Sequence, residues 1–316
     1  MTGSSDSLRP LRVSPARRLL ACTAGAMLLA GPASLVPLDA AAQSPAASAC
    51  PAAGIEAAAV ASVDQRLEIH LKDGRVLRLA GFEPVRPTPD NPDFDTIARD
   101  VLTSVLARAI PGAIGFIPLS PVPDRWGRIP VFAFLSGQEK GAGQPSLAEL
   151  LLTLGYGRFM PEPEARPCQA DFLAAEAGAR ARRNGLWQDP YYAVIAASDT
   201  RAFAEKAATN IIVEGRVRDI DIRPRRSYLL FGPRGSGGFA VTILQRDVKI
   251  FEQAGFAVHA LIGKRIRVRG LLDLRFGPQI AVSDLASIEV VSPSEGASST
   301  GQPVEAKAAD PDEKPQ

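Results

Sequence analysis

Arginines are the side chains in this sequence whose spacing points most directly to a chemical role. Between residues 210 and 291 the chain has 13 Arg and Lys against 8 Asp and Glu. Guanidinium groups donate paired hydrogen bonds to phosphate oxygens, and clustered cations attract nucleic acid. This part of the chain is therefore expected to bind single-stranded nucleic acid or another polyanion. The expectation depends on Arg225 and Arg226 in one loop and on Arg265, Arg267 and Arg269 in one strand.

The side-chain directions in this region leave two interpretations open. Residues that alternate along a strand share a face, so Arg265, Arg267 and Arg269 are expected to point the same way. Aromatic side chains nearby either stack on the bases of a bound strand or fill the core while the arginines face solvent. These aromatic residues are Tyr228, Phe231, Phe239 and Phe276.

The first 42 residues have the organisation of a secretory signal peptide. Arg12, Arg17 and Arg18 form a basic segment before an apolar stretch at residues 19–36, and Ala40-Ala41-Ala42 offers a small-residue cleavage site. A membrane anchor is the alternative, but Gly and Pro interrupt the apolar stretch, which is short for a span. We expect an exported chain, periplasmic or secreted, with no integral membrane span after cleavage.

Cleavage there removes Cys22 and leaves Cys50 and Cys168. In an oxidising compartment this pair predicts one disulfide, which would tie the N-terminal extension to a helix that begins near Pro167. Two free thiols are the alternative. Because the chain has only two histidines, far apart in the sequence, no zinc site is expected.

Local patterns after the linker predict a mainly β chain with helices, of the α+β class. Asp73-Gly74 marks a hairpin turn between two strands, because this pair accepts the positive φ that such turns need. Ser146 and Glu149 form a capping box for a short helix, and a longer helix is expected over residues 167–184. A further helix is expected over residues 95–110, with its buried stripe formed by Ile97, Val101, Val105 and Ala109.

A second β-rich region follows a connector. Five apolar segments separated by turn residues, with one helix near residues 248–254, predict a small barrel of the oligonucleotide/oligosaccharide-binding (OB) type. The chain is thus divided into a signal peptide (1–42), a linker (43–54), a first domain (55–190), a connector (191–208), a second OB-like domain (209–291) and a disordered tail (292–316).

Three stretches of the first domain resemble the staphylococcal-nuclease (thermonuclease) family. They are residues 73–83, the segment Asp124-Arg125-Trp126-Gly127-Arg128, and the closing helical pieces at 147–155, 176–180 and 185–187. The resemblance covers about residues 56–190. It implies a five-stranded OB barrel with three helices and a phosphodiester hydrolase that uses Ca²⁺, two arginines and a glutamate base.

The resemblance assigns phosphate binding to Arg78 and Arg128, which occupy the family's two arginine positions. The carboxylates depart from the pattern. Leu67 stands at the main metal position and has no oxygen for a hard cation. Glu83 stands at the second metal position and is the one carboxylate retained for a metal or catalytic role. Arg86 stands at the base position, where it cannot accept a proton, and it would make the pocket more cationic.

Substitute carboxylates are the alternative to a lost active site. Asp64 would reach the metal position only through a longer hairpin, and Asp90, Asp93 and Asp95 follow in the next loop. Asp also favours solvated loops and helix caps, which is the simpler interpretation of these residues.

Three hypotheses follow from these residues. The first is an exported degenerate nuclease that binds nucleic acid or another phosphate-bearing anion, with no certain cofactor. The second is an active metal-dependent nuclease that cleaves DNA or RNA, in which case Ca²⁺ is its cofactor. The third is an envelope protein-interaction module. The net charge of +2 is too small to favour a partner, and the sequence leaves the oligomeric state open.

Overall fold

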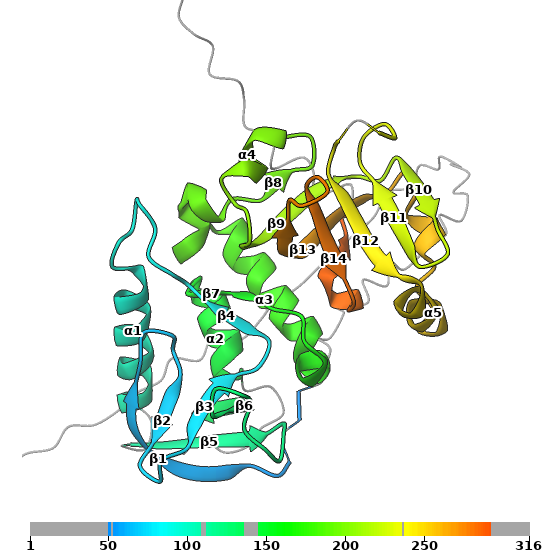
Figure 1. The fold of residues 1–316 in the computed structure, drawn as a ribbon. Helices are drawn as coiled ribbons and strands as arrows, with labels where there is room; N and C mark the ends of the chain where they lie inside the picture. The colour runs from blue at the N-terminus through cyan, green and yellow to red at the C-terminus, as the bar shows by residue number, and fades with distance from the viewer. Residues whose placement is uncertain (1–49, 52, 109–111, 136–144, 236, 292–316) are drawn as a thin grey trace, which may run out of the picture. The chain divides into compact units, whose positions relative to one another are not determined.

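A closed five-stranded barrel forms the first part of the chain. The computed structural model describes residues 50–51, 53–108, 112–135, 145–235 and 237–291. The barrel strands pair in the order β1-β2-β3-β6-β5, and β5 pairs back with β1. Their bounds are β1 (Glu56–Val63), β2 (Ile69–Leu71), β3 (Val76–Leu79), β5 (Ala113–Pro118) and β6 (Arg128–Leu135). Figure 1 shows this barrel and its labels.

The predicted hairpin joins β2 and β3. Gly74 has φ 91°, a value that favours glycine, and the carboxylate of Asp73 accepts a hydrogen bond from the Arg75 amide. In β3, Leu77 and Leu79 are buried in the barrel core. Because side chains alternate along a strand, Arg78 between them points away from that core. The expectation of a mainly β chain with helices is confirmed.

Three α-helices accompany the barrel. They are α1 (Phe94–Arg108), α2 (Leu147–Leu154) and α3 (Gln169–Ala181). Ser146 caps α2, since its hydroxyl accepts a 3.2 Å hydrogen bond from the Glu149 amide. A two-stranded sheet of β4 (Phe82–Pro84) and β7 (Gly157–Phe159) completes this part, with the 3₁₀ helices η1 (Pro163–Cys168), η2 (Gly185–Gln188) and η3 (Pro190–Tyr192).

The predicted buried stripe of α1 is wrong by one position over the described residues, and its last member, Ala109, lies outside them. The helix buries Phe94, Ala98, Leu102 and Leu106, whereas Ile97 is exposed. Both stripes have apolar residues at helical spacing, so periodicity does not separate them. Phe94 decides between them because it packs edge-on against the rings of Tyr156 and Tyr192.

A second sheet contains eight strands in place of the five predicted. The main path runs β10-β11-β12-β14-β13-β9-β8, and β15 pairs with β13. In the described part of the chain its ends, β10 and β8, do not pair with each other, so the predicted second barrel is an open sheet. The strands are β8 (Ile195–Ala196), β9 (Asn210–Arg216), β10 (Asp219–Ile222), β11 (Arg226–Leu230), β12 (Ala240–Leu244), β13 (Arg265–Asp273), β14 (Gln279–Val282) and β15 (Ile288–Val290).

This sheet begins inside the segment predicted to be a connector. Strand β8 pairs in parallel with β9, so residues 195–196 already belong to the second sheet. Helices α4 (Thr200–Ala204) and α5 (Gln245–Gln253), with the 3₁₀ helices η4 (Val258–Leu261) and η5 (Leu285–Ser287), accompany it. Its core includes the stacked rings of Phe203 and Phe239.

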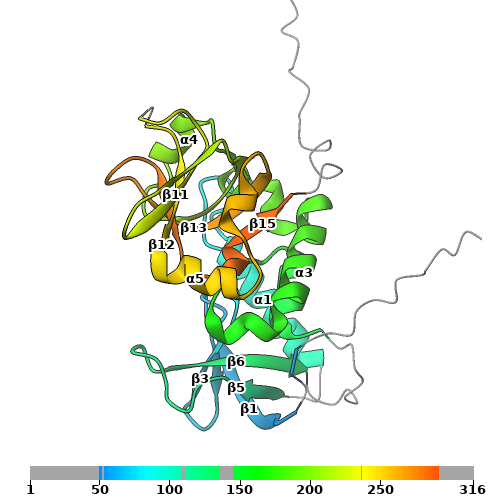
Figure 2. The ribbon, with the colours of Figure 1, turned by 90° about the vertical axis from the view of Figure 1, so that its right-hand side faces the viewer.

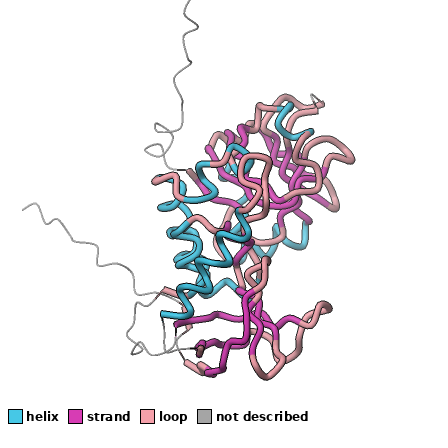
Figure 3. Tube along the Cα trace, turned by 90° about the vertical axis from the view of Figure 1, so that its left-hand side faces the viewer, coloured by secondary structure: helices cyan, strands magenta, loops and turns pink. Residues whose placement is uncertain are grey.

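We call the barrel with its helices, up to Tyr192, the first lobe and residues 195–291 the second lobe, because each has its own apolar core. Both belong to one compact unit within residues 47–316. Helix α3 lies next to the strands β13 and β15 of the second lobe (Figures 1 and 2), and Figure 3 shows helical segments between the two groups of strands. Among the described helices, none has the length and apolar character needed to cross a membrane.

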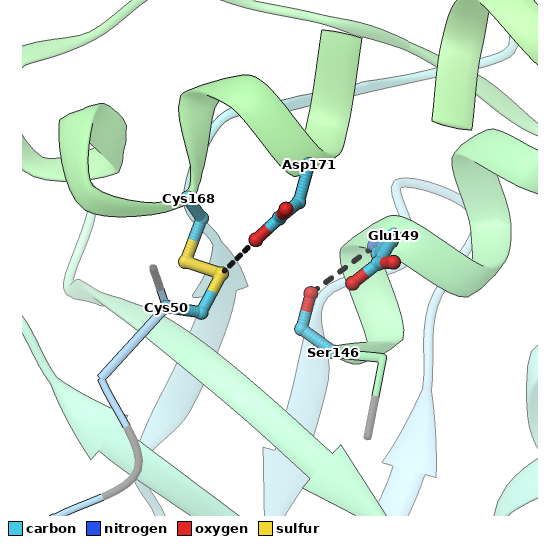
Figure 4. Close-up of a disulfide and its surroundings, with 5 residues drawn as sticks. All are labelled: Cys50, Ser146, Glu149, Cys168 and Asp171. Carbon is cyan, nitrogen blue, oxygen red and sulfur yellow. Dashed lines mark hydrogen bonds between the residues drawn. A yellow bond between two sulfur atoms is a disulfide. The ribbon is translucent and has the colours of Figure 1, made fainter. Parts of the chain in front are cut away.

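The disulfide between Cys50 and Cys168 is present (Figure 4). It joins the segment before β1 to the end of η1, with the two Cα atoms 4.5 Å apart. The predicted signal peptide (1–42), most of the linker and the predicted tail (292–316) lie outside the described residues.

Candidate functional site

A cleft of about 730 Å³ lies at one side of the barrel. It is lined by the four residues that the resemblance placed in one site, Arg78, Glu83, Arg86 and Arg128. These side chains come from β3, β4, the loop after β4 and the start of β6. The barrel and the adjoining β4–β7 sheet therefore bring together residues that are up to 50 positions apart in the sequence.

Arg78 is already bound by a carboxylate. Its Nη1 and Nη2 atoms donate hydrogen bonds of 3.0 Å to the two oxygens of Glu162. The backbone amide of Gly81 also donates to Glu162. A carboxylate held in this two-pronged way takes the geometry that an arginine offers to a phosphate. Glu162 thus takes up hydrogen bonds that a bound phosphate would receive from Arg78.

Arg128 is held by the acidic residue of its own motif. The Oδ2 atom of Asp124 accepts hydrogen bonds of 2.9 and 2.8 Å from Nε and Nη2 of Arg128. The Oδ1 atom accepts from the amides of Trp126 and Arg128. Burial by itself would raise the pKa of Asp124, but these hydrogen bonds outweigh burial and lower it to about 2. Asp124 is therefore ionised at neutral pH and orients Arg128.

The remaining guanidinium nitrogen of Arg128 binds a second carboxylate. Its Nη1 atom donates a 2.7 Å hydrogen bond to Glu68, whose side chain lies in the same cleft. Burial by itself would lower the pKa of Arg128, but the hydrogen bonds to Asp124 and Glu68 raise it. The guanidinium carbons of Arg128 and Arg125 lie 4.6 and 3.9 Å from the centre of the Trp126 ring. Trp126 is 60% exposed. Both arginines matched to phosphate binding are thus ion-paired.

Glu83 is not arranged as a metal ligand or a catalytic group. One of its oxygens accepts a 2.9 Å hydrogen bond from Arg158, and the other accepts a 2.8 Å hydrogen bond from the side-chain amide of Asn210. Two donors on these oxygens compete with a cation. The metal and catalytic roles considered for Glu83 are therefore not supported, because the second lobe supplies Asn210 and β7 supplies Arg158.

The other residues around the implied calcium position do not fit the ion either. Leu67 is buried, and its φ of 57° places it in a tight turn between β1 and β2. Asp64 closes that turn, since its Oδ1 atom accepts from the amides of Arg66 and Glu68 and its Oδ2 atom lies 3.1 Å from His70 Nε2. In the described chain no three His, Cys, Asp or Glu side chains are grouped to hold a metal ion.

The loop aspartates do not assemble as substitute carboxylates. Asp90 and Asp93 are exposed and do not line the cleft. Asp95 does line it, at the start of α1, where its Oδ1 atom accepts a hydrogen bond from the amide of Thr96. One lone carboxylate beside the cleft falls short of the several oxygen ligands that Ca²⁺ requires.

Arg86 and Arg66 are cleft residues whose guanidinium groups remain free to bind a ligand. The backbone of Arg86 is clamped by the hydroxyl of Tyr192, which accepts from the Arg86 amide at 2.8 Å and donates to its carbonyl at 3.2 Å. The exposed guanidinium of Arg86 has no partner among the described residues. The same holds for the exposed side chain of Arg66, which also lines the cleft. The cleft therefore presents two unpaired cations and the ring of Trp126.

The predicted nucleic-acid face of β13 is wrong. Arg265, Arg267 and Arg269 do share a face, but Arg267 and Arg269 are buried. Arg267 bonds Glu214 of β9 and Glu289 of β15, and Arg269 bonds Glu176 of α3 at 2.9 Å. Arg265 is half exposed and bonds Glu214 at 2.6 Å. Helix α3 and neighbouring strands cover this face, so neither buried arginine can contact a ligand.

The remaining candidates of the second lobe divide into two groups. Arg225 and Arg226 are exposed, and their guanidinium groups make no hydrogen bond or ion pair among the described residues, although the charge of Arg226 acts on Asp273. Of the aromatic residues, Phe239 fills the core and Phe231 packs against it. Both therefore agree with the alternative in which the aromatic residues fill the core and do not stack on bases. Phe276 is 89% exposed at the turn between β13 and β14. Of the basic residues singled out in the second lobe, Arg225 and Arg226, at the start of β11, are thus the two whose guanidinium groups face solvent without a hydrogen-bonded partner in the described chain.

Sequence reasoning missed several residues of this site. Glu162, Glu68 and Arg158 were not singled out, although each binds a candidate residue directly. No local pattern identifies them, because Glu162 is 84 positions from Arg78 and Arg158 is 75 positions from Glu83. Arg66 offered one signal, its position next to the expected metal-binding segment.

In comparisons with known proteins, no family model matches this chain and no curated protein matches it.

Proposed function

We propose that this chain is an exported, thermonuclease-like protein that binds a phosphate-bearing anion in the barrel cleft and does not hydrolyse it. Nucleic acid is the first candidate ligand. Support for the thermonuclease-like OB identity comes from the closed five-stranded barrel with its helices and from the meeting of Arg78, Glu83, Arg86 and Arg128 in one cleft. Support for export comes from the disulfide, which persists in oxidising compartments.

The observation that carries the proposal is the state of the charges in the cleft. Hydrolysis needs a group that removes a proton from water, and Arg86 at the base position remains protonated at ordinary pH. Three carboxylates in or beside the cleft are engaged, since Glu83, Glu68 and Glu162 each accept hydrogen bonds from an arginine. In the described chain Asp95 is the one cleft-lining carboxylate that accepts no hydrogen bond from an arginine, and it stands alone, whereas the cleft keeps two free cations.

Binding a phosphate-bearing anion needs hydrogen-bond donors and contact surface but no base, and the cleft provides both. The guanidinium groups of Arg66 and Arg86 can each donate two parallel hydrogen bonds to a phosphate. Trp126 exposes ring surface on which a base can stack. A volume of about 730 Å³ is within the range of small-ligand sites. The combination of two cations and one aromatic ring suits a short single-stranded segment.

The test is a binding and cleavage assay on the purified full chain. Fluorescein-labelled single-stranded DNA and RNA oligonucleotides are titrated with protein at several salt concentrations, with Ca²⁺ and with chelator. We expect salt-sensitive binding without cleavage. In the Arg66→Gln/Arg86→Gln variant we expect about tenfold weaker binding. The slope of log affinity against log salt should decrease in magnitude by about 1.4 if both side chains contact phosphates.

The matched control is Arg225→Gln/Arg226→Gln, which removes two exposed, unpaired arginines from the second lobe. It should leave the affinity near that of the wild type. Ca²⁺-dependent cleavage that disappears in Arg128→Ala would show an active nuclease instead. Loss of affinity only in the control variant would move the site to the second lobe, and no binding to either oligonucleotide would remove nucleic acid as the ligand.

A further inference from the structure

A second, smaller pocket lies where the two lobes meet. Its volume is about 140 Å³. Arg86 and Glu83 line both this pocket and the large cleft, whereas Arg158, Tyr191 and Leu271 line the small pocket and not the large one. We call it the seam pocket. It draws residues from β4 and β7 of the first lobe and from the β9 and β13 strands of the second.

Arg158 is buried at the wall of the seam pocket with part of its guanidinium unused. It is only 9% exposed, and its Nη2 atom donates to Glu83 and to the backbone carbonyl of Asn210, both at 2.9 Å. Its guanidinium carbon lies 5.2 Å from the centre of the Tyr192 ring. Within the described chain its hydrogen bonds all come from Nη2, so its Nε and Nη1 atoms are left without a protein partner. Unused donors of a buried arginine favour an acceptor in the adjoining space.

The fixed charges of the seam pocket sum to one positive charge. Arg86 and Arg158 contribute two cations, and Glu83 contributes one anion. The ion pair between Arg158 and Glu83 is fixed by the register of the strands, since these residues are opposite each other in the β4–β7 sheet. A cation that is partly removed from water is stabilised by an opposite charge nearby. One negative charge would neutralise the pocket.

The rim of the seam pocket is apolar and aromatic. Leu271 on β13 is 57% exposed, and Tyr191 on η3 is also partly exposed. The backbone around Tyr191 is ordered by its neighbours, because Asp189 accepts a 2.8 Å hydrogen bond from the Tyr191 amide and Lys206 donates to its carbonyl. A rim of this kind adds contact area to a ligand whose charged group is bound deeper.

We propose that the seam pocket is a second binding site, which takes a singly charged oxyanion joined to an apolar or aromatic group. The oxyanion accepts hydrogen bonds from the unused donors of Arg158 and from Arg86. The attached group packs on Leu271 and Tyr191. A carboxylate and a phosphodiester both have this chemistry. The site goes beyond the anion-binding cleft, because Arg158, Tyr191 and Leu271 take no part in that cleft.

The test uses two aromatic monoanions as probes, benzoate and methyl phenyl phosphate, with benzyl alcohol as the uncharged control. Binding to the full chain labelled with ¹³C in its leucine methyl groups is followed by NMR, and the Leu271 signal is identified from the Leu271→Ser variant. We expect at least one anion to shift the Leu271 signal saturably, while benzyl alcohol does not. A tighter complex with benzoate assigns a carboxylate ligand, and a tighter complex with methyl phenyl phosphate assigns a phosphodiester.

Variants locate the site. Arg158→Lys keeps the charge and one donor for Glu83 but loses the planar fork, so probe affinity should decrease about tenfold. Tyr191→Leu removes the aromatic ring from the rim, together with its contacts to Tyr192 and Lys206, and should weaken binding several-fold. Because Tyr191 is partly exposed, this variant should stay folded, which keeps the test valid if Arg158→Lys is unstable. Arg66→Gln, which alters only the cleft, should leave probe binding unchanged.

The proposal is overturned if neither anion shifts the Leu271 signal, or if Arg158→Lys and Tyr191→Leu both bind the probes as the wild type does. Its failure is separate from failure of the cleft proposal. The cleft is tested with oligonucleotides and the Arg66→Gln/Arg86→Gln variant, whereas the seam pocket is tested with small monoanions and with Arg158 and Tyr191, which do not line the cleft.

Discussion

Glu176 of α3 and Arg269 of β13 form a fully buried ion pair between the two lobes, with Nη1 and Oε2 2.9 Å apart. The side chain of Glu176 has no exposed surface and that of Arg269 is 4% exposed. Glu176 also accepts hydrogen bonds from Arg180 and from the Phe159 amide, and Arg269 also bonds Glu289. Burial by itself would raise the pKa of Glu176, but Arg269 and Arg180 outweigh it and lower the pKa.

Removing one partner of this pair should destabilise the chain strongly. For Arg269→Met and for Glu176→Gln we expect a loss of about 3–5 kcal/mol in the free energy of unfolding, because an uncompensated charge or donor stays buried. Urea unfolding measures this loss. The matched control is Arg265→Met on the same strand, whose half-exposed pair with Glu214 should be worth about 0–1 kcal/mol. Equal losses at both positions would contradict the role of burial.

Asp124 should make the barrel sensitive to acid in a narrow window. Its pKa in the folded chain is about 2, below the ordinary value of 3.8, so its ionised form stabilises the fold. This contribution is complete above about pH 4 and is lost as pH falls towards 2. The stability difference between the wild type and Asp124→Asn should therefore shrink over this window in urea unfolding. Asp90→Asn, at an exposed loop position, controls for net charge and should show no such change.

Glu149 should make the folded chain less stable as pH rises, in contrast to Asp124, whose contribution is lost as pH falls. Burial, and then the nearby charge of Asp171, raise its pKa above the ordinary value of 4.5, so Glu149 binds a proton more tightly in the folded chain than in the unfolded chain. Figure 4 shows Glu149 and Asp171. The stability that this provides is present below pH 4.5 and is lost as pH rises through the raised pKa. Glu149→Gln should therefore raise the thermal unfolding midpoint at pH 7, and the gain should vanish below pH 4.5. A gain of the same size for the exposed Glu164→Gln would contradict this.

The disulfide should contribute to stability through the long segment that it closes. Cys50 and Cys168 are 118 positions apart, and cross-links of this span typically contribute about 2–5 kcal/mol. The Cys50→Ala/Cys168→Ala variant should lose an amount in this range in urea unfolding. A reductant should lower the stability of the wild type to a similar level and leave the variant unchanged. A reductant effect on the variant would show that another group responds.

Glu162 should limit anion binding in the cleft by holding Arg78. Glu162→Gln keeps an oxygen for the Gly81 amide but removes the charge that neutralises Arg78. If an oligonucleotide phosphate then uses Arg78, affinity should rise by up to about tenfold. Fluorescence anisotropy measures the change, and Glu164→Gln, two positions away and exposed, is the control. Unchanged affinity in Glu162→Gln would mean that the ligand does not reach Arg78.

Local structure could be predicted from the sequence wherever neighbours in the chain decide it. The turn at Asp73-Gly74 and the cap at Ser146 depend on one or two hydrogen bonds within a few residues. The common face of Arg265, Arg267 and Arg269 follows from strand alternation alone. The meeting of Arg78 and Arg128 in one cleft was also predictable, through motifs at spacings that resemble a known family.

By itself, the sequence determined the turn at Asp73-Gly74, the cap at Ser146 and which side of a strand an arginine points to, but not the number of strands in the second sheet. Only the tertiary structure decided what each arginine contacts: Glu162 for Arg78, Glu68 for Arg128 and Glu176 for Arg269. The physical reason is range. Backbone geometry is set by adjacent residues, whereas the partner of a charge is set by packing between segments that are 60 to 93 positions apart.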